Sequence, residues 1–515
     1  MTTRSVSSIS GGRVRRCSLG LCLAAVALLG ATTGAALGQD VLARLPATLG
    51  PDPDQPIWET DLAVGGDRTM AVFNMNPRLV APEMEIGYGR AQYDEGWAWT
   101  GEGVIPTDPN VIVFERLFHP SVAFDGVNDA FVAVACAQEQ DGGAHLVVAR
   151  YDTQWGYWTS RWQQGWLDKP WVAAGEAMAY GQELYAISIH RPPGENPLGY
   201  CYLRSMDGGQ SWKSGQVTLG LDGPRVTASG GYNAAFPAPT TSENGPVHVV
   251  YKYKNNHLAG GKLRFLKGTD INEGEHAGEV EFEELPRAVI PGFGPQGGPQ
   301  KKILEVNLNR GDVLGLVPGP YGGDTSPMGT LTTPQLAVDP TNADRLLLVY
   351  HDTEADSSDV NIYLHVLTRY TPGHWYLGHR IQVNDDPNYV ESDQIHPSIA
   401  VDPNGYVHII FYDDRNYDQP DGQVLDAKYD VFYAWAHVDE LNFQDEGHNE
   451  EFFAEPTEPA LDWGLNVHSI FEPGEYVGIA YDPLRNDVLT SFAGTFTGDP
   501  GPDQSVIWSS QIVWP

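Results

Sequence analysis

The stretch Ser205-Met206-Asp207-Gly208-Gly209-Gln210-Ser211-Trp212 fits the pattern S-x-D-x-G-x-[ST]-W at every fixed position. This pattern predicts a tight turn between two strands. The side chains of Ser205 and Asp207 can accept hydrogen bonds from nearby backbone N–H groups, the glycines allow a positive φ, and Trp212 anchors the next strand. Because these features are structural, the stretch indicates an architecture before it indicates a function.

The stretch resembles the Asp-box of sialidase-like β-propellers, also called the BNR repeat, which turns the chain between the third and fourth strands of a blade. The resemblance implies an all-β fold, a β-propeller of four-stranded antiparallel blades. Two eroded versions of the motif occur elsewhere, Asp94-Glu95-Gly96-Trp97-Ala98-Trp99 and Pro372-Gly373-His374-Trp375. They predict equivalent turns in two further blades.

A second repeat runs through the chain independently of the turn motif. His119-Pro-Ser-Val-Ala-Phe-Asp125 matches His396-Pro-Ser-Ile-Ala-Val-Asp402, and further copies lie at 333–339 and 476–482, with a partial copy at 169–174. Each copy alternates small and apolar residues, which is typical of a strand. We interpret the copies as the inner strands of blades, and we expect their alanines to be buried at equivalent positions. These are Ala123, Ala337, Ala400 and Ala480.

The repeats divide the chain into seven units. They span about 58–105, 117–165, 168–220, 230–270, 331–385, 394–445 and 474–514. Because the first and last units could combine to close the ring, six and seven blades both stay open. We predict one sialidase-like propeller domain over residues 39–515. Residues 271–330 and 446–473 do not fit the repeat and are predicted to be insertions.

The N-terminal 38 residues are predicted to be a signal peptide. Four arginines precede an apolar run, Leu19–Leu29, and Ala36-Leu37-Gly38 offers a cleavage site. The run is much shorter than the ~20 residues of a spanning helix, which argues against the alternative of a membrane anchor. We therefore expect a secreted or periplasmic protein. Arg15-Arg16 leaves both the Sec and the twin-arginine route open.

Composition restricts the partners and the redox chemistry. The chain has 67 acidic and 31 basic residues and a formal net charge of −36. Such a field repels nucleic acid and anionic membranes, so we expect neither as a partner, and no membrane span after signal cleavage. We expect a monomer. Cys136 and Cys201 follow the signal peptide, and a disulfide and two buried thiols are both compatible with their apolar surroundings.

The resemblance to sialidases implies an active site that this sequence does not match. Those enzymes bind a substrate carboxylate with three arginines, the first in an Arg-Ile-Pro-like motif, and use a Tyr–Glu nucleophile pair and an Asp acid/base. The nearest candidate here, Pro77-Arg78-Leu79, has the wrong order. We assign no catalytic residue and favour a binding protein over an enzyme. A glycoside hydrolase of sialidase-like fold, or a polysaccharide lyase, is the alternative.

A ligand site is predicted at the propeller axis, where the inner strands begin and residues from distant units converge. We expect the ligand to be a glycan or another extracellular molecule, such as a protein. The alternative is that these side chains cap their strands and meet water. The predicted ligand-binding residues are His119, Asp168, Lys169, Asp393, His396 and Glu475.

Two further patterns have an ordinary structural alternative. Acidic loops follow the second strands of two units, and their hard oxygen donors would suit a structural Ca²⁺, although no cofactor is required. The candidate ligands are Asp352, Asp356, Asp413 and Asp414. Solvated loops are the alternative. Five tryptophans crowd into residues 155–171, where packing between blades is favoured over stacking on sugar rings.

Overall fold

The structure is a computed structural model. It describes residues 57–75, 85–93, 97–106, 114–139, 143–190, 199–217, 238–240, 247–253, 262–270, 280–287, 303–308, 312–318, 327–331, 334–353, 360–371, 374–384, 393–413, 428–441, 465–466, 477–496 and 504–513. These residues form 31 β-strands and no helix. Within the described residues there is accordingly no helix of the length and apolarity that crossing a membrane requires.

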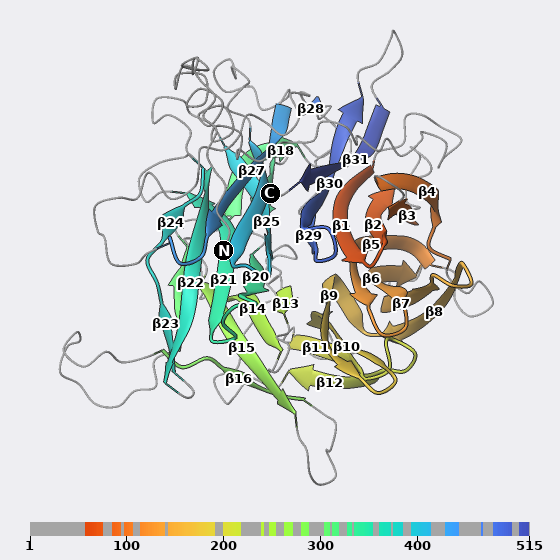
Figure 1. The fold of residues 1–515 in the computed structure, drawn as a ribbon, viewed down its shortest axis with the longest axis horizontal. Coiled ribbons are helices and arrows are strands. Elements are labelled where there is room, and N and C mark those ends of the chain that lie inside the picture. Colours follow the sequence, from red (N-terminus) through yellow and green to blue (C-terminus); the bar gives the residue numbers. More distant parts are fainter. Residues whose placement is uncertain are drawn as a thin grey trace, which may run out of the picture.

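Six four-stranded antiparallel sheets form the blades of a β-propeller (Figure 1). In each sheet the strands follow chain order, from the inner to the outer edge. The first three blades are β1 (Ile57–Gly65), β2 (Arg68–Met75), β3 (Glu85–Tyr93) and β4 (Trp97–Val104); β5 (Phe114–Asp125), β6 (Ala130–Glu139), β7 (Ala144–Asp152) and β8 (Tyr157–Gln164); and β9 (Trp166–Met178), β10 (Gly181–His190), β11 (Gly199–Ser205) and β12 (Lys213–Val217).

The second half of the ring repeats this arrangement with additions. Its blades are β13 (Ala238–Thr240), β14 (His248–Tyr253), β15 (Lys262–Asp270) and β16 (Val280–Glu284); β20 (Gln335–Val338), β21 (Arg345–Thr353), β22 (Val360–Thr371) and β23 (His374–Leu377); and β25 (Gln394–Val401), β26 (Tyr406–Asp413), β27 (Lys428–His437) and β28 (Leu465–Asn466). Two short strands extend the first two of these blades. β17 (Glu305–Asn307) pairs with β15, and β24 (Ile381–Gln382) pairs with β22. A separate hairpin consists of β18 (Asp312–Pro318) and β19 (Pro327–Leu331).

A three-stranded sheet closes the ring between the last and the first four-stranded blade. It consists of β29 (Gly478–Asp482), β30 (Asp487–Phe496) and β31 (Gln504–Val513). The inner strands contact one another in the order β1, β5, β9, β13, β20, β25, β29 and back to β1, and in Figure 1 the C-terminal strands lie beside β1. A Cβ at Gly478 would lie 2.7 Å from the Leu62 nitrogen, so glycine allows this close approach. The first and last units therefore form separate sheets and do not combine into one blade.

The Asp-box occupies the turn that the sequence predicted, between β11 and β12, the outer two strands of the third blade. The Oδ1 of Asp207 accepts a hydrogen bond from the Ser211 backbone N–H at 2.8 Å, and Gly209 donates its N–H to the Ser205 hydroxyl at 2.8 Å. Gly208 has φ +67°, a conformation that a Cβ would strain. The Trp212 indole N–H donates to the Gly209 carbonyl at 3.0 Å. This bond fixes the Trp212 side chain against the turn.

The recurring Asp that ends each predicted inner strand closes the turn to the second strand. The Oδ1 of Asp402 accepts from the N–H groups of Asn404 and Tyr406, both at 2.8 Å. Asp125, Asp339 and Asp482 accept backbone N–H groups two residues ahead in the same way. All four carboxylates are fully buried. Asp is therefore required here as a turn acceptor, because it satisfies backbone donors that the turn removes from water.

The core lies between neighbouring blades, because each sheet is covered on both faces. The second strands are the most buried, with every residue of β21 after Arg345 inaccessible to water. Leu364 of β22, for example, packs in one apolar cluster with Phe411 of β26 and Ala434 of β27 in the next blade. Burying such a side chain contributes about 1.5–3 kcal/mol. The continuous apolar runs of the sequence, such as Phe131–Ala137, are these second strands.

Several expectations need correction. Ala123, Ala337, Ala400 and Ala480 lie at equivalent places, two residues before the Asp, but only Ala123 is buried. The other three are half-buried. The predicted insertion 271–330 contains β16, the fourth strand of the fourth blade, and also β17, β18 and β19. The second predicted insertion, 446–473, contains β28, and its other residues lie outside the described part.

The structure also decides between the alternatives for two of the tryptophans, packed or exposed, and for the two cysteines, bridged or free. Trp155 is 69% exposed and Trp162 is 39% exposed, so packing between blades is the wrong interpretation for these two residues. Cys136 and Cys201 are both buried and do not form a disulfide. Burial raises the pKa of the Cys201 thiol to about 12, which keeps it protonated and unreactive.

Candidate functional site

Three inner strands share an unusual backbone conformation near their first residues. His119 of β5, Lys169 of β9 and His396 of β25 have positive φ values of 55°, 45° and 53°. Each residue precedes a proline, and each lies in a break of the register with the second strand of its blade. β1 has a register break at the equivalent place, at Glu59. Three inner strands, β5, β9 and β25, therefore carry the same β-bulge, and β1 has a register break at the matching place.

The bulge explains the proline but not the side chain before it. A proline has no N–H for the ladder, and a bulge removes that requirement. Glycine would adopt the positive φ without steric cost, whereas a residue with a Cβ pays roughly 1–2 kcal/mol. His119, Lys169 and His396 thus occupy positions that local energetics would give to glycine. Such strain at side chains facing one region is typical of binding and active sites.

Neighbouring blades hold two of these bulges in place. The N–H of His119 donates to Asn74 Oδ1 at 3.0 Å, and the N–H of His396 donates to His351 Nδ1 at 3.2 Å. Asn74 and His351 lie on β2 and β21, the second strands of the preceding blades. The same hydrogen bond therefore recurs between different pairs of blades. It fixes the strained backbone from outside the strand.

Two of the three bulge side chains, Lys169 and His396, are almost fully buried. Burial lowers the pKa of His396 well below its usual value, and the positive charges of His351 and Lys169 lower it further. Lys169 belongs to the third blade and His396 to the sixth, and at least two inner strands separate them in either direction around the ring. Lys169 and His396 are 5% and 2% exposed.

His351 completes this side of the site. Its ring lies edge-on to that of His396, with centroids 5.4 Å apart. Because the depressed pKa keeps the His396 imidazole neutral at physiological pH, one ring nitrogen can donate a hydrogen bond and the other can accept one. Together with the Lys169 ammonium group, the pair can bind hydroxyl or carboxylate oxygens. This donor-rich group contrasts with the acidic composition of the whole chain.

Buried amides support the start of β25 just ahead of His396. Asn384 donates from Nδ2 to Gln394 Oε1 at 2.9 Å and to Asn361 Oδ1 at 2.7 Å. Asp393 accepts the Val360 N–H at 3.1 Å. These bonds join the fifth and sixth blades immediately beside the bulge, so they restrict the position of His396.

A buried carboxyl joins the first two inner strands on the other side. Asp61 of β1 accepts the Ser121 hydroxyl at 2.9 Å and the Val122 N–H at 2.8 Å, both on β5. Ser121 in turn accepts the Val172 N–H of β9 at 3.2 Å. Burial raises the pKa of Asp61 to about 6, although its hydrogen bonds from Val122, Ser121 and Leu62 lower it. Asp61 thus connects blades beside the bulges.

The structure describes the side chains of only some of the predicted ligand-binding residues. His119, Lys169 and His396 share the bulge position, and Asp393 lies at the start of β25. Asp168 precedes Lys169 in β9, and its side chain is outside the described part of the structure. Glu475 lies outside the described residues. The ligand site at the axis therefore stays a prediction, with four of its six side chains placed at one end of the inner strands.

The predicted calcium ligands receive no support from the described chain. Asp413 is the last residue of β26 and Asp352 the last but one of β21, and both are fully buried. Asp356 and Asp414 lie outside the described residues. Among the residues that are described, no group of three or more His, Cys, Asp or Glu side chains is arranged to hold a metal ion.

Sequence reasoning did not single out His351 or Asn74. Both contact a bulge from a neighbouring blade, so their part in the site depends on packing between blades that are far apart in sequence. A signal was present at His351-Asp352, a polar pair directly after the buried run of β21. It was interpreted as the start of an acidic loop.

No protein-family model and no curated protein sequence matches this chain. Among solved structures, an α-L-arabinofuranosidase of Fusarium graminearum with a bound iminosugar inhibitor is similar, with a TM-score of 0.39 and 9% identity over 78% of this chain and 95% of that one. The hemagglutinin-neuraminidase ectodomain of parainfluenza virus 5 has a TM-score of 0.38 and 8% identity, covering 72% and 80%.

The Trypanosoma rangeli sialidase in complex with the inhibitor DANA has a TM-score of 0.38 and 10% identity, covering 87% of this chain and 68% of that one. At these values the similarities carry no argument about ligand or chemistry. The fold assignment rests on the ring of sheets and on the Asp-box between the outer strands of the third blade. In fold, the chain is a β-propeller with an Asp-box turn in its third blade.

Proposed function

We propose that this protein is a secreted propeller that binds a glycan, or another extracellular ligand, at the bulge end of its axis. One observation carries the proposal, namely that three equivalent bulges hold His, Lys and His in a conformation that favours glycine. The supporting contacts from Asn74 and His351 add to it, since they hold the strained positions in place. A purely structural bulge would not need these side chains.

The chemistry favours recognition of oxygen-rich ligands. Lys169 and the neutral His396 can donate hydrogen bonds, and imidazole nitrogens can also accept them. Sugar hydroxyls require such mixed partners, and a carboxylate would pair with the ammonium group. The proposal assigns no catalytic residue.

The test combines a glycan panel with two variants. Replacing His119 and His396 together by alanine should abolish binding at the axis while the far-ultraviolet circular dichroism and the melting temperature change little. His374→Ala, an exposed histidine on the outer strand β23, is the matched control and should bind as the unmodified protein does. Normal binding by the double variant would refute the proposed location. Release of reducing sugar in the same panel would instead favour a glycoside hydrolase.

A further inference from the structure

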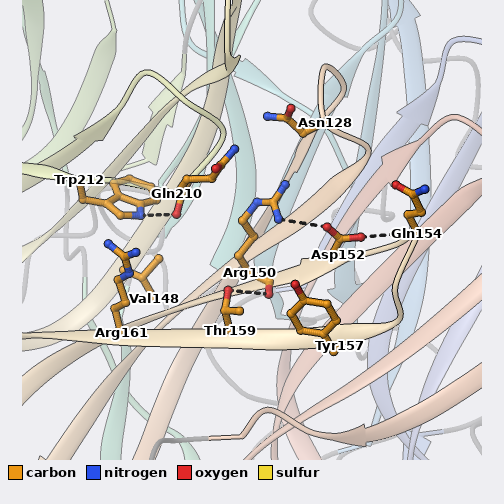
Figure 2. Close-up of a pocket in the computed structure, with 11 residues that line it drawn as sticks. Asn128, Val148, Arg150, Asp152, Gln154, Tyr157, Thr159, Arg161, Gln210 and Trp212 are labelled. Carbon is orange, nitrogen blue, oxygen red and sulfur yellow. Dashed lines mark hydrogen bonds and ion pairs between the residues drawn. The ribbon is translucent and has the colours of Figure 1, made fainter.

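A groove lies between the second and third blades, away from the axis (Figure 2). Its floor is formed by β7 and β8, the outer two strands of the second blade, and one side is formed by the Asp-box turn of the third blade. The volume is about 480 Å³, within the range of small-ligand sites. Because the inner strands line the axis, this groove is a separate location from the site proposed above.

The floor is regular because alternate residues of paired strands share one face. Arg150 pairs with Thr159, Asp152 with Tyr157, and Val148 with Arg161, so all six side chains point into the groove. Arg150 also donates from Nε to the Gly208 carbonyl at 3.0 Å. This bond joins the floor to the Asp-box turn, whose own hydrogen bonds fix Trp212. The groove is therefore held open without a ligand, which lowers the entropic cost of binding.

The lining combines aromatic faces with hydrogen-bonding groups. Tyr157 is 52% exposed and Trp212 is half-buried, and Figure 2 shows them at opposite ends of the groove. The lining also includes the amide of Gln210, the hydroxyl of Thr159 and the carboxylate of Asp152. Sugar rings present apolar faces for the aromatic residues and hydroxyl groups for the polar ones, so this pairing is what a short oligosaccharide needs.

The charged residues of the groove restrict the class of sugar that it can bind. Arg150 is balanced by Asp152, with Nη1 and Oδ2 3.6 Å apart. Arg161 is exposed and, among the described residues, has no carboxylate within ion-pair distance, although acidic residues outnumber basic ones by 67 to 31 in the chain. A guanidinium group binds a carboxylate with two parallel hydrogen bonds. The groove is thus suited to a sugar that carries one.

We propose that this groove binds a short acidic oligosaccharide, with a uronate carboxylate on Arg161 and sugar rings against Tyr157 and Trp212. The assignment does not depend on the axis site. It gives the Asp-box of this chain a second use, since the turn that closes the third blade also supplies one side of the groove.

The experiment uses isothermal titration of the full chain with uronate trisaccharides of four kinds, galacturonate, glucuronate, mannuronate and guluronate, and with their neutral methyl esters. At least one free acid should bind more tightly than its ester. Arg161→Gln should weaken binding of that acid by about tenfold or more and should leave the ester nearly unchanged. Tyr157→Ala should weaken both. Trp155→Ala, which changes a more exposed aromatic residue that does not line the groove, should weaken neither.

Three results would overturn the proposal. The first is that no trisaccharide of the panel binds. The second is that Arg161→Gln binds the acid as well as the unmodified protein does. The third is that oligoglutamate competes as effectively as the uronate, which would mean that the groove recognises charge and not sugar. The double alanine variant of His119 and His396 separates the two sites, because it should retain binding in this groove.

Discussion

The bulge at His119 allows the strain of the candidate site to be measured. His119→Ala removes the imidazole but keeps a Cβ at φ +55°, whereas His119→Gly removes both. The difference between the free energies of unfolding of the two variants therefore reports the backbone strain at position 119 without the imidazole. A residue with a Cβ pays roughly 1–2 kcal/mol in the left-handed region. Glycine loses about 0.5–1 kcal/mol more than alanine in ordering its backbone. We therefore expect His119→Gly to be more stable than His119→Ala by about 0.5–1 kcal/mol.

The control is Ala123→Gly, four residues later in the same strand. Ala123 is buried and its φ is not in the left-handed region. Glycine should therefore destabilise the protein there by at least about 0.5–1 kcal/mol. The difference in stability between glycine and alanine should therefore have opposite signs at positions 119 and 123 of β5. Equilibrium unfolding in urea, followed by tryptophan fluorescence, measures both differences from the transition midpoints at a common slope.

A refuting result is simple to state. If His119→Gly is no more stable than His119→Ala, the bulge stores no strain and the argument for a functional site at the axis loses its main support. The stabilised glycine variant should also have lost ligand binding, as the alanine variant should. A gain in stability that accompanies a loss of binding is the expected pattern where a site is kept against the local preference of the chain.

The remaining predictions concern pH, the turn and packing. The raised pKa of Asp61, about 6, means that its contribution to the free energy of unfolding falls by about 3 kcal/mol as pH rises from about 4 to about 6, and Asp61→Asn should remove this slope. Burial lowers the pKa of His365 to about 4, so its contribution is lost as pH falls below about 6.5, and His365→Gln should change the slope in the opposite sense. Urea titrations between pH 4 and 7 would show both, and parallel curves would contradict them. Asp207→Ala should cost roughly 1–2 kcal/mol through lost turn hydrogen bonds and should not change ligand binding at the axis; a binding defect at an unchanged melting temperature would reverse that assignment. Ala123→Leu should cost about 1–3 kcal/mol, and more than Ala480→Leu, because only the first is buried; equal costs would count against this difference in packing.

Much of the fold could be predicted because its signals are local. The Asp-box places every group of its turn within eight residues, so its hydrogen bonds follow from the sequence alone. The recurring Asp of the inner strands is equally local, since it accepts N–H groups two residues ahead. β16 was missed because Val280–Glu284 carries neither signal. It alternates apolar and acidic residues, like an exposed outer strand, and a long segment precedes it.

The candidate site could be predicted only in part. The position of the bulge residues at the strand starts followed from the repeat, but their positive φ did not, because a residue before proline usually adopts an extended conformation. The contacts of His351 and Asn74 depend on which second strand lies beside which inner strand. The groove was missed for the same reason. Its lining comes from two blades, and the exposure of Tyr157 depends on how those blades meet.

The two ends of the inner strands differ in a way that separates structure from recognition. At one end the repeated residue is always Asp in Asp125, Asp339, Asp402 and Asp482, and its role is always to close a turn. At the other end the residue in the register break changes, from Glu59 in β1 to histidine or lysine in β5, β9 and β25. The role in the turn requires the same carboxylate wherever this turn recurs. A ligand on the axis is not symmetric about it, so a site for one requires different side chains at equivalent positions, and the bulge end is where this chain has them.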